Sequence, residues 1–241
     1  ALAAASLQAS SARAALWLAW VLHGSALAWA MLEPTPRFGF ASALSVTAWL
    51  VLTVYAIERQ LFPQLQTRWE LAALGSVAVL LALVFPGSAL PLSATAWLPL
   101  HLALGISAYG LLAAAVVHAA LMTRAERRIR LAEDPHSGMP LLTLERLTFR
   151  FVTAGFVLLT ATLAAGMLFS EALYGRAWRW DHKAVFSVLS WLTFAALLIG
   201  RKRFGWRGRS AVRVLYAGAL LLLLAYVGSR FALEVVLGRA A

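Results

Sequence analysis

The sequence contains no cysteine. Disulfide bonds, thiolate catalysis and zinc or iron–sulfur sites built on cysteine are therefore excluded. The metalloprotease pattern HExxH, the hydrolase pattern GxSxG, the Walker A loop and the Rossmann glycine motif are missing as well. Since these absences remove the familiar catalytic signatures, we do not expect a stand-alone enzyme.

Charged residues are also scarce, at 13% of the chain, and only 10 of them are acidic. Acids such as Glu33, Glu58, Glu70 and Glu171 fall at the ends of the predicted helices. Transporters coupled to protons or cations usually place carboxylates within the membrane. The positions of the acids therefore disfavour that class of function.

What the chain has in abundance is long apolar runs, and 62% of its residues are hydrophobic. A helix that crosses the hydrocarbon core needs about 20 mainly apolar residues. The pattern predicts an all-α, polytopic transmembrane bundle that forms a single domain over residues 1–241. We expect seven spans, near 13–32, 39–57, 70–86, 97–122, 150–170, 184–200 and 211–233. Residues 1–9 are apolar but too short to span, and we interpret them as part of an eighth helix or as a partly ordered leader.

The net charge of +11 comes from 21 Lys and Arg residues whose positions are uneven. Most of them fall on one side of the predicted spans, above all in the segments 124–130, 146–150 and 201–213. The positive-inside rule makes this side cytoplasmic. The basic excess is then a topology signal and an attraction to anionic lipid head groups, so the bilayer is the expected partner and nucleic acid is not.

The opposite side carries a loop between Phe169 and Lys183 in which aromatic rings and cations alternate. Its rings suit a flat apolar ligand, and its cations suit acidic edges on that ligand. The same composition is typical of an interfacial aromatic belt with snorkelling cations, so both interpretations stay open. The candidate binding residues are Tyr174, Arg176, Trp178, Arg179, Trp180, Asp181, His182 and Lys183.

Two histidines reach this outer side by independent routes. His101 begins the fourth predicted span, and His182 immediately precedes the sixth. Imidazole is a common axial ligand of haem iron, so His101 and His182 are candidate iron ligands. Trp178 and Trp180 could flank the porphyrin ring, and nearby cations could pair with its carboxylates.

Two further histidines, His23 and His118, lie inside predicted spans and are secondary candidates. An ionisable group at that depth faces protein or water, so each is either a cofactor ligand or a neutral histidine hydrogen-bonded to a neighbouring helix. For His23 the expected partner is Ser25 or a backbone carbonyl. His118 lies 17 residues after His101, about 25 Å of helical rise, so these two cannot bind one metal ion.

The stretch GFVLLTATLAAGMLFSEALYGRAWRWDHKAVFSVLSWLTFAALLIGR, with PLLTLERLTFRFVTAGF before it, resembles the cytochrome c assembly protein family. This family contains CcsA- and CcmC-type haem-handling membrane proteins, and the chain looks most similar to its YpjD-like branch. The similarity extends over residues 95–240. It implies a bacterial inner-membrane protein that binds haem at its outer face, with haem and cytochrome c maturation components as partners.

The resemblance also assigns residues to the family's tryptophan-rich loop and external histidines. Trp178, Trp180, Asp181 and Lys183 match the WxWDxK portion of the loop, and His101 matches the first external histidine. The chain departs from the family pattern elsewhere. Phe169 and Tyr174 replace tryptophans, His182 replaces a proline, Ala184 replaces a glutamate, and no histidine follows in the last outer segment. These departures support an alternative function, a haem-independent accessory subunit of another membrane complex such as a metal-ion transporter.

Overall fold

The computed structural model describes residues 2–33, 35–61, 69–89, 97–131, 140–171 and 177–237. Helices dominate these residues, as the apolar runs predict, because a helix satisfies every backbone polar group without water. The main helices are α1 (Leu2–Leu32), α2 (Phe40–Leu61), α3 (Trp69–Val84), α4 (Trp97–Arg130), α5 (Leu141–Leu168), α7 (His182–Phe204) and α8 (Gly208–Leu223). The all-α polytopic membrane bundle is confirmed.

Each of the seven expected spans coincides with a helix, but their lengths differ. Within the described residues, six segments are long and apolar enough to cross a membrane, whereas the apolar part of α3, Ala72–Val84, is shorter. Residues 2–12 belong to α1, which runs as one helix from Leu2 to Leu32. Beyond α8 the helix continues through a π-helical segment (Leu224–Gly228), α9 (Ser229–Phe231) and a second π-helical segment (Ala232–Val236).

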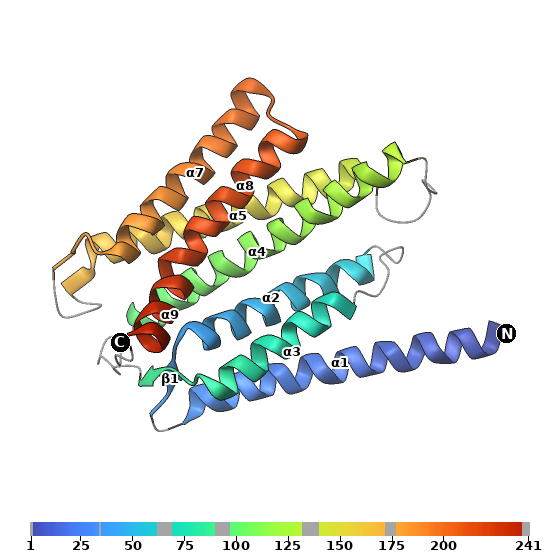
Figure 1. Cartoon of the computed structure of the whole chain (residues 1–241), viewed down its shortest axis with the longest axis horizontal. Coiled ribbons are helices and arrows are strands. Elements are labelled where there is room, and N and C mark those ends of the chain that lie inside the picture. Colours follow the sequence, from blue (N-terminus) through green and yellow to red (C-terminus); the bar gives the residue numbers. More distant parts are fainter. Residues whose placement is uncertain are drawn as a thin grey trace.

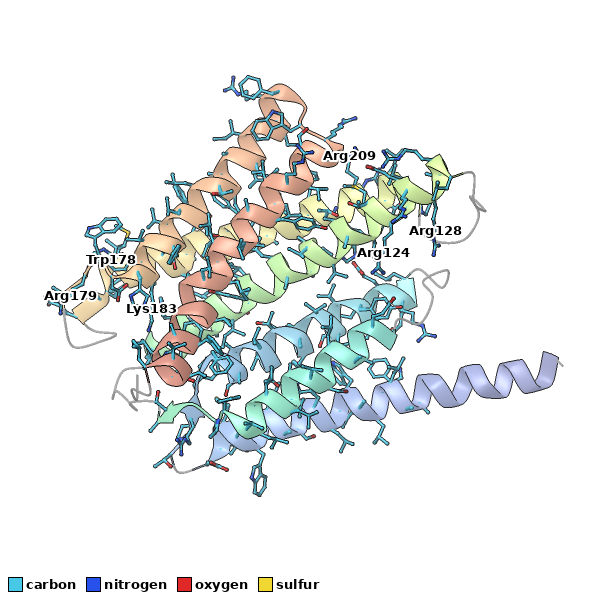
Figure 2. The ribbon with its side chains drawn as sticks, in the orientation of Figure 1. Arg124, Arg128, Trp178, Arg179, Lys183 and Arg209 are labelled. Atoms are coloured by element: carbon cyan, nitrogen blue, oxygen red, sulfur yellow. The ribbon has the colours of Figure 1, made fainter. Side chains whose placement is uncertain are left out.

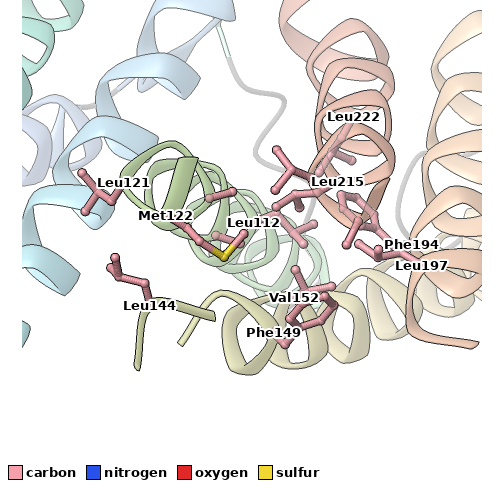
Figure 3. Packing of buried hydrophobic residues seen from close by; sticks show 14 of the residues in the cluster. Leu112, Leu121, Met122, Leu144, Phe149, Val152, Phe194, Leu197, Leu215 and Leu222 are labelled. Carbon is pink, nitrogen blue, oxygen red and sulfur yellow. The ribbon is translucent and has the colours of Figure 1, made fainter. Parts of the chain in front are cut away.

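The bundle has two parts, which Figure 1 shows side by side. Helices α4, α5, α7 and α8 form the larger part, and α1, α2 and α3 lie along the other side of α4. The buried core belongs to the larger part (Figure 3), where Leu112 of α4, Val152 of α5, Phe194 of α7 and Leu215 of α8 are almost inaccessible. Packing and small residues hold such helices together in a membrane, since lipid is as apolar as the core.

A two-stranded sheet and a small apolar cluster connect the loops at one end of the bundle. The strands β1 (Arg37–Phe38) and β2 (Ser88–Ala89) pair antiparallel, with Arg37 opposite Ala89. A second apolar cluster, formed by Phe38, Phe40, Ala41, Ala43 and Val227, joins this strand pair to α2 and the π-helical segment. The β1–β2 pair therefore ties the loops before α2 and after α3 to the C-terminal helix.

A group of arginines and the tryptophan Trp178 lie at opposite ends of the molecule. In Figure 2, Arg124, Arg128 and Arg209 lie towards one end, which we call the basic end. Trp178, Arg179 and Lys183 lie at the other, which we call the tryptophan end. The helix α7 runs between them, from its cap at Asp181 to Gly205, whose φ of 66° closes the helix beside Arg201–Arg203. This separation matches the charge asymmetry that the sequence shows.

Candidate functional site at the tryptophan end

His101 and Trp178 both lie beside Gly166. An ideal Cβ built on Gly166 would lie 3.4 Å from His101 Cε1 and 3.5 Å from Trp178 Cζ3. The three residues come from the second turn of α4, the last turn of α5 and the loop before α7. Because glycine has no side chain, α5 leaves room for an imidazole and an indole from separate segments. The structure thus brings together two of the residues that the sequence nominates.

The indole of Trp178 has an unused hydrogen-bond donor. Its Nε1 is buried and has no acceptor among the residues that the structure describes. A buried N–H without a partner costs about 1–3 kcal/mol, so such a group points to a missing acceptor. Trp180 packs edge-on against the Trp178 ring, with ring centroids 6.0 Å apart, and is itself 66% exposed. The pair gives this end one sheltered and one open aromatic surface.

The other predicted site residues have different surroundings. His182 and Arg179 are exposed. Asp181 accepts a hydrogen bond from the Ala184 backbone N–H at 2.9 Å and so caps α7. Tyr174 and Arg176 lie outside the described residues. The use of His101 and His182 as a pair of iron ligands stays a prediction.

A polar cluster that the sequence reading did not assign lies at the same end. The Arg230 guanidinium is 3.8 Å from the Glu234 carboxylate and donates to Ser88 Oγ at 3.1 Å. Lys183 Nζ and the Arg230 guanidinium both lie within 6 Å of the Tyr226 ring centroid, at 5.9 and 5.7 Å. The spacing of Arg230 and Glu234, four residues apart in an apolar helix, is the signal that could have predicted this pair.

The secondary candidate His23 is engaged within the bundle. His23 Nε2 and Ser45 Oγ of α2 are 2.9 Å apart and buried. Our prediction of Ser25 as the partner was wrong. The His23 side chain lies on the face of α1 that packs against α2, so its partner comes from α2 and not from its own helix. The contact favours the structural interpretation of His23.

His118 is engaged through both ring nitrogens. Nδ1 lies 2.7 Å from the Ala114 carbonyl oxygen and Nε2 lies 2.8 Å from Glu58 Oε2. Glu58 lies near the end of α2, as expected. Its side chain is nevertheless 5% exposed and contacts His118 of α4, so the carboxylate points inward between the two helices. Both nitrogens of His118 are occupied, which favours a structural role over iron binding.

Comparison with known proteins agrees with this architecture. The helices and their charge distribution define a multi-span membrane protein. A family model described as Cytochrome C assembly protein matches residues 11–237. The chain belongs to the cytochrome c assembly protein family, and the match reaches well before the 95–240 range that carried the resemblance.

Individual relatives agree with the YpjD-like branch. The chain is 33% identical to the inner membrane protein YpjD of Escherichia coli K12 over 148 residues, which cover 60% of this chain and 55% of YpjD. It is 33% identical over 239 residues to a 28.8 kDa protein of the nifR3-like 5′ region of Azospirillum brasilense, covering 92% and 86% of the two chains.

More distant similarity reaches a cytochrome c biogenesis protein. CcsA of Prochlorococcus marinus NATL1A is 35% identical over 85 residues, 35% of this chain and 27% of CcsA. The aligned regions therefore span only about half of YpjD and a quarter of CcsA. No solved structure matches the chain.

Proposed function

We propose that this protein acts in cytochrome c biogenesis in the bacterial inner membrane and handles haem at the tryptophan end. The observation that carries the proposal is that His101 and Trp178 both lie beside Gly166, at the end opposite to the basic end. Family membership supports haem as the ligand, and the positive-inside rule supports an outer position for this end. The protein would bind and present haem and would not act as an enzyme on its own.

The residues present fit a haem in several respects. The His101 imidazole is a suitable iron ligand, and the Trp178 indole beside it offers an apolar wall. The buried Trp178 Nε1 donor would gain an acceptor from a haem carboxylate. Arg179 and Lys183 are close in sequence and can pair with carboxylates. His182 is the candidate for a second iron ligand because it begins α7 directly after this loop.

An absorption spectrum of the detergent-purified protein, recorded with and without added haem, tests the proposal. We expect a Soret band that weakens in His101→Ala and shifts in His182→Ala, because each change removes an axial imidazole. Trp178→Phe should reduce haem retention, whereas Trp29→Phe, at a residue 74% exposed on α1, should not. A missing band under both conditions, or a band unchanged in both histidine variants, would rule out the site.

The alternative function is a haem-independent accessory subunit of another membrane complex. The exposure of His182, Arg179 and Trp180 favours this accessory function, because exposed side chains do not form an enclosed ligand site. Co-purification separates the two functions. A stoichiometric membrane partner obtained without haem, combined with a flat absorption spectrum, would support the accessory role.

A further inference from the structure

A groove of about 840 Å³ is lined by residues of α1, α2 and α3. These three helices lie beside the larger part of the bundle, which is formed by α4, α5, α7 and α8 (Figure 1). Its size is within the range of about 300–1,000 Å³ found for ligand sites. The walls are mainly apolar and aromatic. They include Trp17 and Trp20 of α1, Leu52 and Tyr55 of α2, and Val79 and Leu80 of α3.

The groove is about one membrane leaflet deep. Along α1 it extends from Leu16 to Ala26, which corresponds to about 15 Å of helical rise. The hydrocarbon core of a bilayer is about 30 Å thick. The groove therefore begins near one membrane surface and ends near the middle of the bilayer, which is the length that one lipid acyl chain occupies.

Polar groups line the groove at its surface end. Arg59 and Gln60 belong to the last turn of α2, which ends at Leu61 on the basic side of the molecule. No carboxylate in the described part of the chain forms an ion pair with Arg59, and the preceding Glu58 is engaged by His118. The guanidinium is thus available, and guanidinium groups bind phosphate through paired hydrogen bonds.

We propose that this groove binds an anionic glycerophospholipid from the leaflet at the basic end. The lipid phosphate lies against Arg59 and Gln60, and an acyl chain follows the wall formed by Trp17, Leu52 and Leu80. Basic pockets between membrane helices bind anionic head groups in this way. A partner's transmembrane helix would require the full membrane thickness and a width of about 10 Å, more than a groove one leaflet deep provides.

Native mass spectrometry of the full chain in mild detergent tests the proposal. The probes are phosphatidylglycerol and phosphatidylcholine with the same acyl chains. We expect wild-type protein to retain phosphatidylglycerol preferentially. Arg59→Gln should reduce retention about fivefold, since one basic residue contributes about a fivefold gain near an anionic head group. Arg59→Lys should recover part of it, and Ala56→Phe, which fills the groove, should reduce retention of both lipids.

Two comparisons separate a specific site from a general attraction to lipid. Arg127→Gln removes a charge at the same end of the molecule but outside the groove, and it should leave retention unchanged. A melting curve for each variant confirms that the bundle is intact. The proposal is overturned if folded Arg59→Gln retains as much phosphatidylglycerol as wild type, or if Arg127→Gln loses as much. A dimer that Ala56→Phe dissociates would instead assign the groove to a second copy of the chain.

Discussion

Glu58 on α2 and His118 on α4 lie 2.8 Å apart, and both side chains are buried between the helices. A backbone carbonyl only accepts hydrogen bonds, so His118 Nδ1 carries the hydrogen that it donates to Ala114. Nε2 and Glu58 Oε2 then hold one proton between them, and the pair is neutral overall. Glu58 Oε1 has no partner within the described ranges and borders a cavity of about 10 Å³, close to the size that admits one water.

This pair predicts a graded response to substitution of Glu58. Glu58→Leu should lower the free energy of unfolding by about 1–3 kcal/mol, because it leaves His118 Nε2 buried without a partner. Glu58→Gln should cost less, since its amide can donate to Nε2. Thermal unfolding in detergent measures both. The control is Glu70→Gln, whose ion pair with Arg124 is exposed at 3.7 Å and should matter by less than about 1 kcal/mol. Equal losses for Glu58→Leu and Glu70→Gln would contradict the buried pair.

The contact between α4 and α5 predicts a contrast between two glycines. A Cβ on Gly155 would lie 2.7 Å from Cγ of Leu112, which is 1% exposed and has nowhere to move. Gly155→Ala should therefore destabilise the bundle by about 1–3 kcal/mol through overpacking. A Cβ on Gly105 would meet Thr162 Cγ2 at an ordinary 3.5 Å. Gly105→Ala should be neutral or slightly stabilising, given alanine's better helix propensity. The unfolding midpoints of the two variants compare them directly.

The cap at Asp181 predicts that its hydrogen bond matters more than its charge. Asp181→Ala should cost about 1 kcal/mol of stability, because the Ala184 N–H loses its acceptor, whereas Asp181→Asn can still accept. Hydrogen exchange at the first turn of α7 measures the effect locally. If Asp181→Asn loosens that turn as much as Asp181→Ala, the carboxylate acts through charge and not as a cap.

The position of Gly166 predicts an effect on haem that depends on side-chain size. If the proposed function is right, Gly166→Ala should keep most haem binding, since its Cβ would stand at 3.4 and 3.5 Å from His101 and Trp178. Gly166→Leu should abolish binding because it separates the two rings. The Soret absorbance reports binding, and the melting temperature shows whether the bundle stays folded. A folded Gly166→Leu variant that binds haem normally would place the haem elsewhere.

The local features of the structure could be predicted from the sequence. Apolar length predicted the helices, and the imbalance of Lys and Arg separated the basic end from the tryptophan end. The capping Asp181 and the closing Gly205 follow from residue type as well. The family could be recognised because its loop around Trp178, Trp180 and Asp181 is contiguous. These features depend on residues within one helical turn or one span, and over that range hydropathy and charge determine the local structure.

The side-chain pairings were decided by the tertiary structure. Glu58 with His118, His23 with Ser45, and Arg230 with Ser88 all join segments far apart in the chain, and Gly166 brings His101 and Trp178 to one place. Which face of a membrane helix points inward is hard to deduce from apolar residues, because lipid and protein core are equally apolar. The sequence alone thus determined the class, the spans and the family. The rotation of each helix, set by close packing at residues such as Gly155 and Gly166, determined which polar groups meet.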